Sequence, residues 1–352
     1  MQDWSGKAKE IQPIDSSWRA QARHRLKEQT RPEGSLGRLE AAIEKLVAIQ
    51  KKNSLSVKTK RILIFAADHG VSEEGVSLYP SEVTAAMVHN FLNGGATINA
   101  LARKINAEVH VIDVGVSGDL KPHPHLIDAK IRRGTRNMTR EPVMTEDELD
   151  CAMSIGWALV KQAKEDGVEL LGLGEMGIGN TTAASAVISA LTHRPVESVT
   201  GRGTGLDEEA LKHKTDIIET SLKRHADSLT NPLSILRYVG GYEIAAMTGA
   251  ILSGAFFGLP VVIDGWIVSA SALSAARLNS TVLDFLFFAH QSQEKGHRVL
   301  LEEMEVSPLL DLGMRLGEAS GAALAMGLLD AAAAIYNEVA TFEEAGVARA
   351  HD

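Results

Sequence analysis

The sequence predicts an α/β fold in which helices cover both faces of a parallel sheet, with a small helical domain beside it. Five short apolar runs each end in glycine or a small polar residue and are followed by a helical stretch. Within each run the apolar residues are continuous rather than alternating, which is typical of strands buried on both faces. The two ends of the chain have helical patterns and supply the second domain.

The first helical segment covers residues 16–52. Leu39, Ile43 and Leu46 recur there at three- and four-residue spacing, which predicts an amphipathic helix. The preceding stretch RPEGSLG contains proline and glycine, which interrupt helices. We therefore expect a helix–loop–helix outside the sheet.

The five apolar runs are the predicted strands: RILIFAADHG, EVHVIDVGV, VELLGLGEMG, LPVVIDGW and TVLDFLFFAH. In open parallel sheets, ligands bind at the carboxyl ends of the strands. The loops that begin at Asp68, Asp113, Gly172, Asp264 and His290 are therefore candidate walls of a site. For these aspartates, and for His69 and His290, structural roles are at least as well supported as contact with a substrate.

The tail from Ser307 onward is alanine-rich, and we expect it to be helical through about Val339. The predicted organisation is residues 1–60 in the small helical domain and residues 61–306 in the large α/β domain. Residues 307–352 would place a loop around Glu318 at the active site and add their remaining helices to the small domain.

Composition restricts the classes of partner. The 352 residues carry a formal net charge of −9, which gives no general attraction to nucleic acid or to an anionic membrane. Cys151 is the only cysteine, which excludes an internal disulfide framework and a thiolate metal cluster. No signal peptide or membrane span is evident, so we expect a cytoplasmic protein.

His123 and His125 favour a surface turn over a metal site, because no further ligands accompany them in the sequence.

The most informative segment is VELLGLGEMGIGNTTAASAV, a buried strand that enters a glycine-rich loop before a helix. Backbone N–H groups at a helix start bind anions, so we predict a phosphate at this turn. Two alternatives remain open. The glycines could serve packing only, or Gly172, Gly174 and Gly177 could form the G-x-G-x-x-G motif of a dinucleotide-dependent oxidoreductase. Against the oxidoreductase, Glu175 inside the loop would oppose a pyrophosphate.

Two charged residues are further candidates. Lys214 follows a second glycine-rich stretch, TGRGTG, and could reach a phosphate or could be an ordinary surface lysine. Glu318 stands among small and apolar residues in RLGEASGAA. It could be a general base with a pKa raised by burial, or a helix-start acid that accepts backbone hydrogen bonds.

Six segments in order resemble the nicotinate-nucleotide:dimethylbenzimidazole phosphoribosyltransferase family: RPEGSLGRLE, AADHGVSEEGVSLYPSEVT, GLGEMGIGNTTAA, VIDGWIVSASAL, HQSQEKGHRVL and MRLGEASGAALAM. The resemblance implies a homodimer with a Rossmann-like parallel sheet and a small helical domain built from both chain ends. It makes Glu318 the catalytic base and places Glu175 at the reaction centre. It also argues against a non-catalytic nucleotide-binding regulator, because Glu318 is preserved.

The resemblance implies transfer of ribose 5-phosphate from nicotinate mononucleotide to a benzimidazole-type base, with no cofactor and no metal. The expected phosphate and ribose contacts are Gly177, Ile178, Gly179, Asn180, Thr181, Thr182, Gly203, Thr204 and Lys214. The expected pocket for the acceptor base is Tyr79, Pro80, Met87, Leu316 and Gly317. Relatives often carry a small polar residue at position 79 and glutamine at position 87, so base preference could differ here. Ala319 and Glu33 also depart from the family pattern, and we expect neither to abolish activity.

Overall fold

The computed structural model describes residues 4–348, and its centre is a six-stranded parallel sheet. The strands are β1 (Lys60–Ala67), β2 (Ala107–Gly115), β3 (Leu126–Asp128), β4 (Leu170–Met176), β5 (Val261–Ile263) and β6 (Leu286–Phe288). They lie in the order β3-β2-β1-β4-β5-β6, and each neighbouring pair is parallel. The order in which the chain adds strands reverses between β1 and β4, and that point opens a crevice at the carboxyl ends. The predicted fold class is confirmed.

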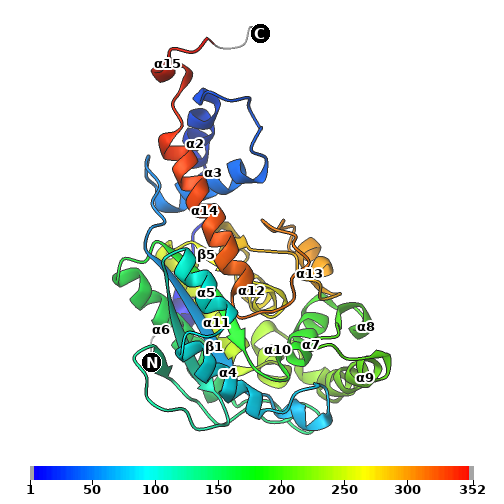
Figure 1. Cartoon of the computed structure of the whole chain (residues 1–352). Helices are drawn as coiled ribbons and strands as arrows, with labels where there is room; N and C mark the ends of the chain where they lie inside the picture. Colours follow the sequence, from blue (N-terminus) through cyan, green and yellow to red (C-terminus); the bar gives the residue numbers. More distant parts are fainter. Residues whose placement is uncertain (1–3, 349–352) are drawn as a thin grey trace.

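Helices surround the sheet (Figure 1). They are α1 (Trp4–Ala8), α2 (Ser16–Glu28), α3 (Arg38–Gln50), α4 (Glu82–Leu92), α5 (Thr97–Lys104), α6 (Glu146–Glu165), α7 (Asn180–Thr192), α8 (Val196–Val199), α9 (Glu208–His225), α10 (Pro232–Val239), α11 (Tyr242–Phe257), α12 (Trp266–Leu278), α13 (His297–Glu303), α14 (Ser320–Glu338) and α15 (Phe342–Ala345), with 3-10 turns at Gly70–Glu74, Ala226–Ser228 and Ser280–Phe285. None of the helices within residues 4–348 combines the length and the apolar character needed to cross a bilayer.

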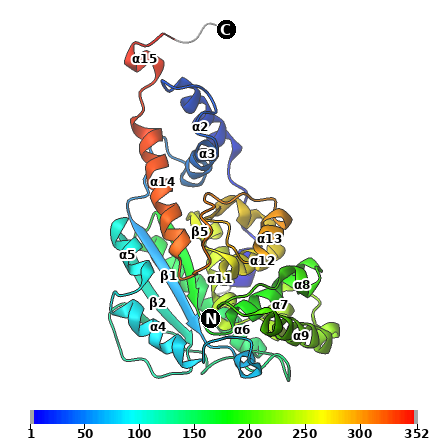
Figure 2. The same ribbon diagram turned by 45° about the vertical axis from the view of Figure 1, so that its right-hand side comes forward.

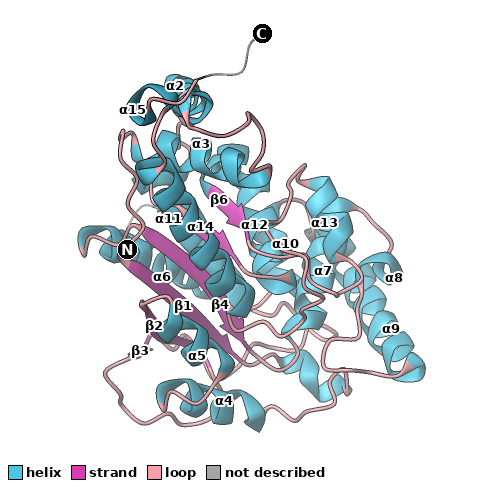
Figure 3. Ribbon diagram, turned by 45° about the horizontal axis from the view of Figure 1, so that its top comes forward, coloured by secondary structure: helices cyan, strands magenta, loops and turns pink. Residues whose placement is uncertain are grey.

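The sheet is covered on both sides, as continuous apolar strands require. Helices α5 and α14 pack on one face, and Figure 3 shows α14 lying across the strands. Helices α11 and α12 pack on the other face, with α6 against α11. Phe65 of β1 and Leu173 of β4 are fully buried. Burying such side chains stabilises the fold by about 1.5–3 kcal/mol each.

Helices from both chain ends meet at one end of the molecule (Figure 2). Helices α2 and α3 pack together, and α3 contacts α14. The Gln29 side-chain amide donates to the Ile335 carbonyl at 2.9 Å, and Arg25 donates to the Tyr336 carbonyl at 3.0 Å. The 19 residues of α14 therefore extend from the sheet into this helical end.

Several features differ from the sequence expectations. The first half of the predicted strand TVLDFLFFAH is a 3-10 turn that ends at Phe285, and only Leu286–Phe288 is a strand. The tail becomes helical only at Ser320, because Pro308 and two glycines with positive φ, Gly313 and Gly317, keep the preceding segment irregular. Strand β3 was not predicted, since none of its three residues is fully buried and they do not form a continuous apolar run. Helix α1 lies against α6 and α11 rather than with α2 and α3. The predicted domain boundaries stay predictions.

Candidate active site

A cavity of about 570 Å³ opens at the carboxyl ends of β4 and β5. It is lined by most of the sequence-predicted site residues, namely Tyr79, Met87, Glu175, Gly177, Ile178, Asn180, Thr181, Gly203, Thr204, Leu316, Gly317 and Glu318. Four predicted residues, Pro80, Gly179, Thr182 and Lys214, do not line it. The cavity also has walls that the sequence did not single out as site residues, among them Trp266, Glu294 and Arg315.

Glu318 lies on the turn that precedes α14. Its backbone is left-handed, with φ 61°, and Ala319 follows with φ 63°. Non-glycine residues rarely adopt this conformation, and it persists where neighbouring structure enforces it. Glu318 is 7% exposed, and burial raises the pKa of its carboxyl above the ordinary 4.5. The turn therefore presents a desolvated carboxylate to the cavity.

Asp264, at the end of β5, holds that turn in place. Its Oδ1 accepts the Ala322 N–H at 2.8 Å, and the backbone N–H groups of Gly321 and Ala319 also donate to this carboxyl. A carboxylate from another strand thus takes the place of a local N-cap for α14. Sequence spacing left open whether Glu318 was the helix-start acid, and the structure gives that role to Asp264. Burial raises the pKa of Asp264 to about 7, although the backbone donors oppose the shift.

Glu175, near the end of β4, faces the same turn. Its carboxyl accepts hydrogen bonds from the Asn180 side chain and from the Glu318 backbone N–H. A Cβ on Gly317 would lie 2.6 Å from Glu175 Oε1, so glycine lets the Glu318 turn approach this closely. Burial, followed by the charges of Asp264, Glu243 and Glu318, raises the pKa of Glu175 to about 8. A nearby positive charge would lower these raised pKa values and favour the ionised carboxylates, so the cluster suits a cationic substrate.

Lys214 of α9 lies directly behind the glycine-rich loops. Its Nζ donates to Thr181 Oγ1 at 2.8 Å and to the Gly201 carbonyl at 3.3 Å. The residue is 1% exposed, which excludes the surface-lysine alternative, and burial lowers its pKa to about 8. Gly203, with φ 51°, approaches Thr181 so closely that a Cβ would lie 2.9 Å from its Oγ1. This arrangement places a desolvated cation beside the start of α7.

The oxidoreductase motif is not formed. Gly172 and Gly174 lie inside strand β4, which continues to Met176, so the loop begins at Gly177 rather than at the expected Gly172. A Cβ on Gly172 would lie 3.0 Å from Met326 Sδ, and one on Gly174 would lie 2.4 Å from the Ala319 nitrogen. These two glycines therefore serve close packing of α14 on the sheet. A dinucleotide fingerprint needs all three glycines in the turn between strand and helix.

Part of the cavity lining is apolar. Met87 of α4 and Val83 belong to this part, while Tyr79 and Leu316 stand at the mouth with 53% and 51% exposure. This surface fits a flat heterocycle better than a phosphate.

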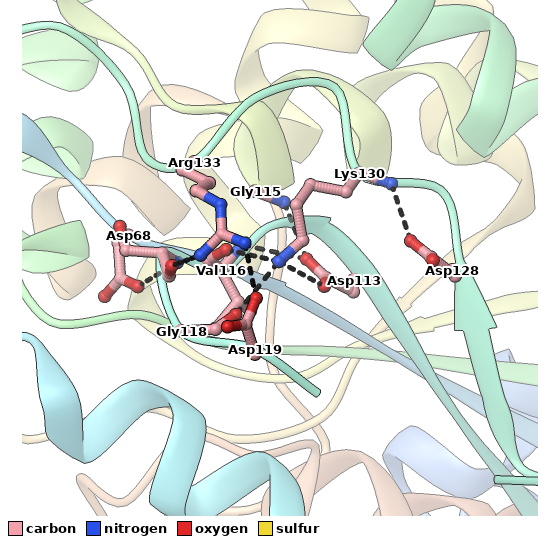
Figure 4. Close-up of polar contacts among 10 residues, drawn as sticks. Asp68, Asp113, Gly115, Val116, Gly118, Asp119, Asp128, Lys130 and Arg133 are labelled. Atoms are coloured by element: carbon pink, nitrogen blue, oxygen red, sulfur yellow. Dashed lines mark hydrogen bonds and ion pairs between the residues drawn. The ribbon is translucent and has the colours of Figure 1, made fainter. Parts of the chain in front are cut away.

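The acids at the ends of β1 and β2 have structural partners (Figure 4). Asp113 accepts the Val116 N–H at 2.8 Å and pairs with Lys130 at 3.1 Å. Asp68 accepts the Ser117 N–H at 2.7 Å. Neither residue lines the cavity, whereas Asp264 and His290, which follow β5 and β6, do.

Comparisons with known proteins identify the family of this chain. A family model described as phosphoribosyltransferase matches residues 11–347. The nicotinate-nucleotide–dimethylbenzimidazole phosphoribosyltransferase of Geobacter sulfurreducens is 51% identical over 338 residues, covering 96% of each chain. The crystal structure of CobT from Thermus thermophilus superposes with a TM-score of 0.91 at 46% identity, covering 95% of this chain and 100% of that one. The chain therefore belongs to the nicotinate-nucleotide–dimethylbenzimidazole phosphoribosyltransferase family.

Proposed function

We propose that this chain transfers ribose 5-phosphate from nicotinate mononucleotide to 5,6-dimethylbenzimidazole or a related base, giving α-ribazole 5′-phosphate and nicotinate for the lower ligand of a cobamide. Membership of the family supports the activity. The observation that carries the chemistry is that Glu318, Glu175 and Thr181 line one cavity, with Lys214 bonded to Thr181.

The proposed reaction is an inverting displacement at C1′. A ring nitrogen of the base attacks C1′ while the bond to nicotinate breaks, and the bonding electrons neutralise the departing pyridinium. The other ring N–H of the base gives its proton to the Glu318 carboxylate, so the product does not accumulate positive charge. Positive charge that develops on the ribose would lower the raised pKa of Glu175, and the ionised carboxylate would stabilise that charge. No step of this scheme requires a metal, because no pyrophosphate leaves.

The 5-phosphate would lie near Gly177–Thr182 and the 203–204 loop, where Lys214 supplies a positive charge. Pinning the phosphate holds C1′ in line between the two bases, which reduces the entropic part of the barrier. The implied homodimer stays a prediction.

The direct test is incubation with nicotinate mononucleotide and 5,6-dimethylbenzimidazole, with products separated by chromatography. We expect nicotinate and α-ribazole 5′-phosphate in equal amounts, with both substrates required. Equal nicotinate release without the base would make the protein a hydrolase instead. Binding of NAD(H), followed by its fluorescence, would favour the oxidoreductase alternative.

Replacing Lys214 with methionine should raise the KM for nicotinate mononucleotide by about 10–100-fold. The change removes the positive charge that lies beside the expected phosphate and polarises Thr181, and charge-assisted hydrogen bonds contribute roughly 1.5–3 kcal/mol. The side chain keeps its apolar length, so the fold should survive. In the wild type the cation is lost as pH rises through about 8, so KM should increase above that pH. Steady-state kinetics of Lys214→Met and of the wild type at several pH values would measure both changes in KM. Lys212→Met, at an exposed position on α9, is the control. An unchanged KM in Lys214→Met would show that Lys214 does not take part in phosphate binding.

Replacing Met87 with glutamine should change the preference among acceptor bases. An added amide can donate to a purine nitrogen, and one such bond is worth about 1 kcal/mol, or roughly fivefold in relative kcat/KM. Competition among dimethylbenzimidazole, adenine and a phenol measures this ratio. Met314→Gln, outside the cavity lining, is the matched control. If the ratios of Met87→Gln equal those of the control, Met87 does not contact the acceptor.

A further inference from the structure

Three potential metal ligands meet at the edge of the sheet, away from the catalytic cavity. Glu108 and His110 stand two residues apart on β2 and so point to the same face. His125 comes directly before β3, the strand that pairs with β2. One ligand atom from each of the three side chains lies within 4.8 Å of the others. Pairing of β2 with β3 therefore places Glu108 and His110 beside His125. These are the further ligands that the residues around His125 in the sequence do not supply.

One bond between strands and one turn bond fix the backbone of the cluster. The Val111 N–H donates to the His125 carbonyl at 2.9 Å, and the Leu126 N–H donates to the His123 carbonyl at 3.0 Å. Pro122 and Pro124 restrict the backbone on both sides of His123. Ligands on a stiff frame lose little entropy when they bind an ion.

The side chains are also oriented. Glu108 Oε1 lies 2.7 Å from His110 Nε2, and Arg61 Nε donates to Glu108 Oε2 at 2.9 Å. Asp166 in turn accepts from Arg61 at 2.7 Å. Hydrogen-bonded partners of this kind hold the carboxylate ligands of metal sites in position. The imidazole rings of His110 and His125 have centroids 6.0 Å apart.

The kind of ion follows from the donor set. Two imidazoles and one carboxylate, with an open fourth position, are the ligands that Zn²⁺ takes in many proteins. Mg²⁺ and Ca²⁺ prefer oxygen ligands only. We propose that Glu108, His110 and His125 bind one Zn²⁺ ion, with water in the fourth position.

The proposed ion would lie away from the catalytic cavity. Glu108 pairs in the sheet with Arg61, near the amino end of β1, whereas the catalytic residues follow the carboxyl ends. Strand β3 has three residues and ends a long irregular segment at the sheet edge, so a metal clip to β2 would suppress local opening there. The zinc proposal and the transferase proposal are therefore independent, and an experiment that disproves one leaves the other standing.

Titration of tag-free, metal-stripped protein with ZnCl₂ in a calorimeter tests the proposal. We expect one ion per chain and at least a tenfold loss of affinity in His125→Ala and in His110→Ala. His24→Ala is the control, because this histidine is exposed and distant from the cluster in the sequence, and its affinity should be unchanged. At a free Zn²⁺ concentration of about 100 Kd, Tm should rise by about 2–4 °C, and the same concentration of Mg²⁺ should not raise it.

His125 is exposed, so its alanine variant should fold, and circular dichroism would verify this. The absence of saturable binding in the wild type would overturn the proposal. Binding that survives in both histidine variants would also overturn it, because the ion would then lie elsewhere. Nicotinate release should be equal in the metal-stripped and zinc-loaded protein.

Discussion

Replacing Glu318 with glutamine is expected to lower kcat by about 10²–10⁴-fold, the range that general acid–base catalysis contributes. Glutamine has nearly the same shape, and the turn is held by Asp264 through backbone groups, so the fold and the binding of nicotinate mononucleotide should be retained. In the wild type, activity should fall at low pH as Glu318 takes up a proton. Because burial raises its pKa, this loss should occur above pH 4.5.

The measurements are single-turnover nicotinate release for the rate and calorimetry for mononucleotide binding. Glu338→Gln, at the exposed far end of the same helix, controls for the loss of a carboxylate. Near-wild-type turnover in Glu318→Gln would remove this residue from the role of base.

Replacing Glu175 with glutamine is expected to slow the reaction by about 10–10²-fold and to stabilise the protein at alkaline pH. The pKa of Glu175 is raised from 4.5 to about 8, so between these values the folded chain binds a proton that the unfolded chain releases. Stability contributed by the protonated form is therefore present below pH 4.5 and is lost as pH rises through about 8. A neutral amide keeps the contact with Asn180 and removes this dependence.

We therefore expect Glu175→Gln to raise Tm relative to wild type by about 2–5 °C at about pH 8.5 and by much less at about pH 5. Scanning calorimetry at the two pH values measures the difference, and Glu209→Gln, on the exposed start of α9, is the control. An equal difference at both pH values would mean that the carboxyl is not protonated in the folded protein. Such a gain in stability at the expense of rate is common where active sites bury charge.

The fold was largely predictable, because strands buried on both faces leave continuous apolar runs. RILIFAADHG and VELLGLGEMG both became central strands. Strand β3 was not predictable, since its three residues owe their conformation to pairing with β2 rather than to their own pattern.

The site was predictable in part. Kinship pointed to Glu318 and Glu175, and both line the cavity. Asp264 was recognised only as a strand-end acid, because no spacing reveals that its carboxyl accepts N–H groups from a turn far along the chain. Likewise, Lys214 is buried because α9 packs behind the two glycine-rich loops, and a sequence motif does not predict that packing.

Helix α14 starts at the Glu318 turn and ends among α2 and α3. At about 1.5 Å per residue its 19 residues form a rod of about 28 Å. A tilt of about 2° pivoting at the far end would move the carboxylate by about 1 Å, a misplacement that can cost roughly 100-fold in rate. The distant helical end therefore anchors α14, and a change there would displace the carboxylate of Glu318, the proposed proton acceptor, without altering any residue of the cavity.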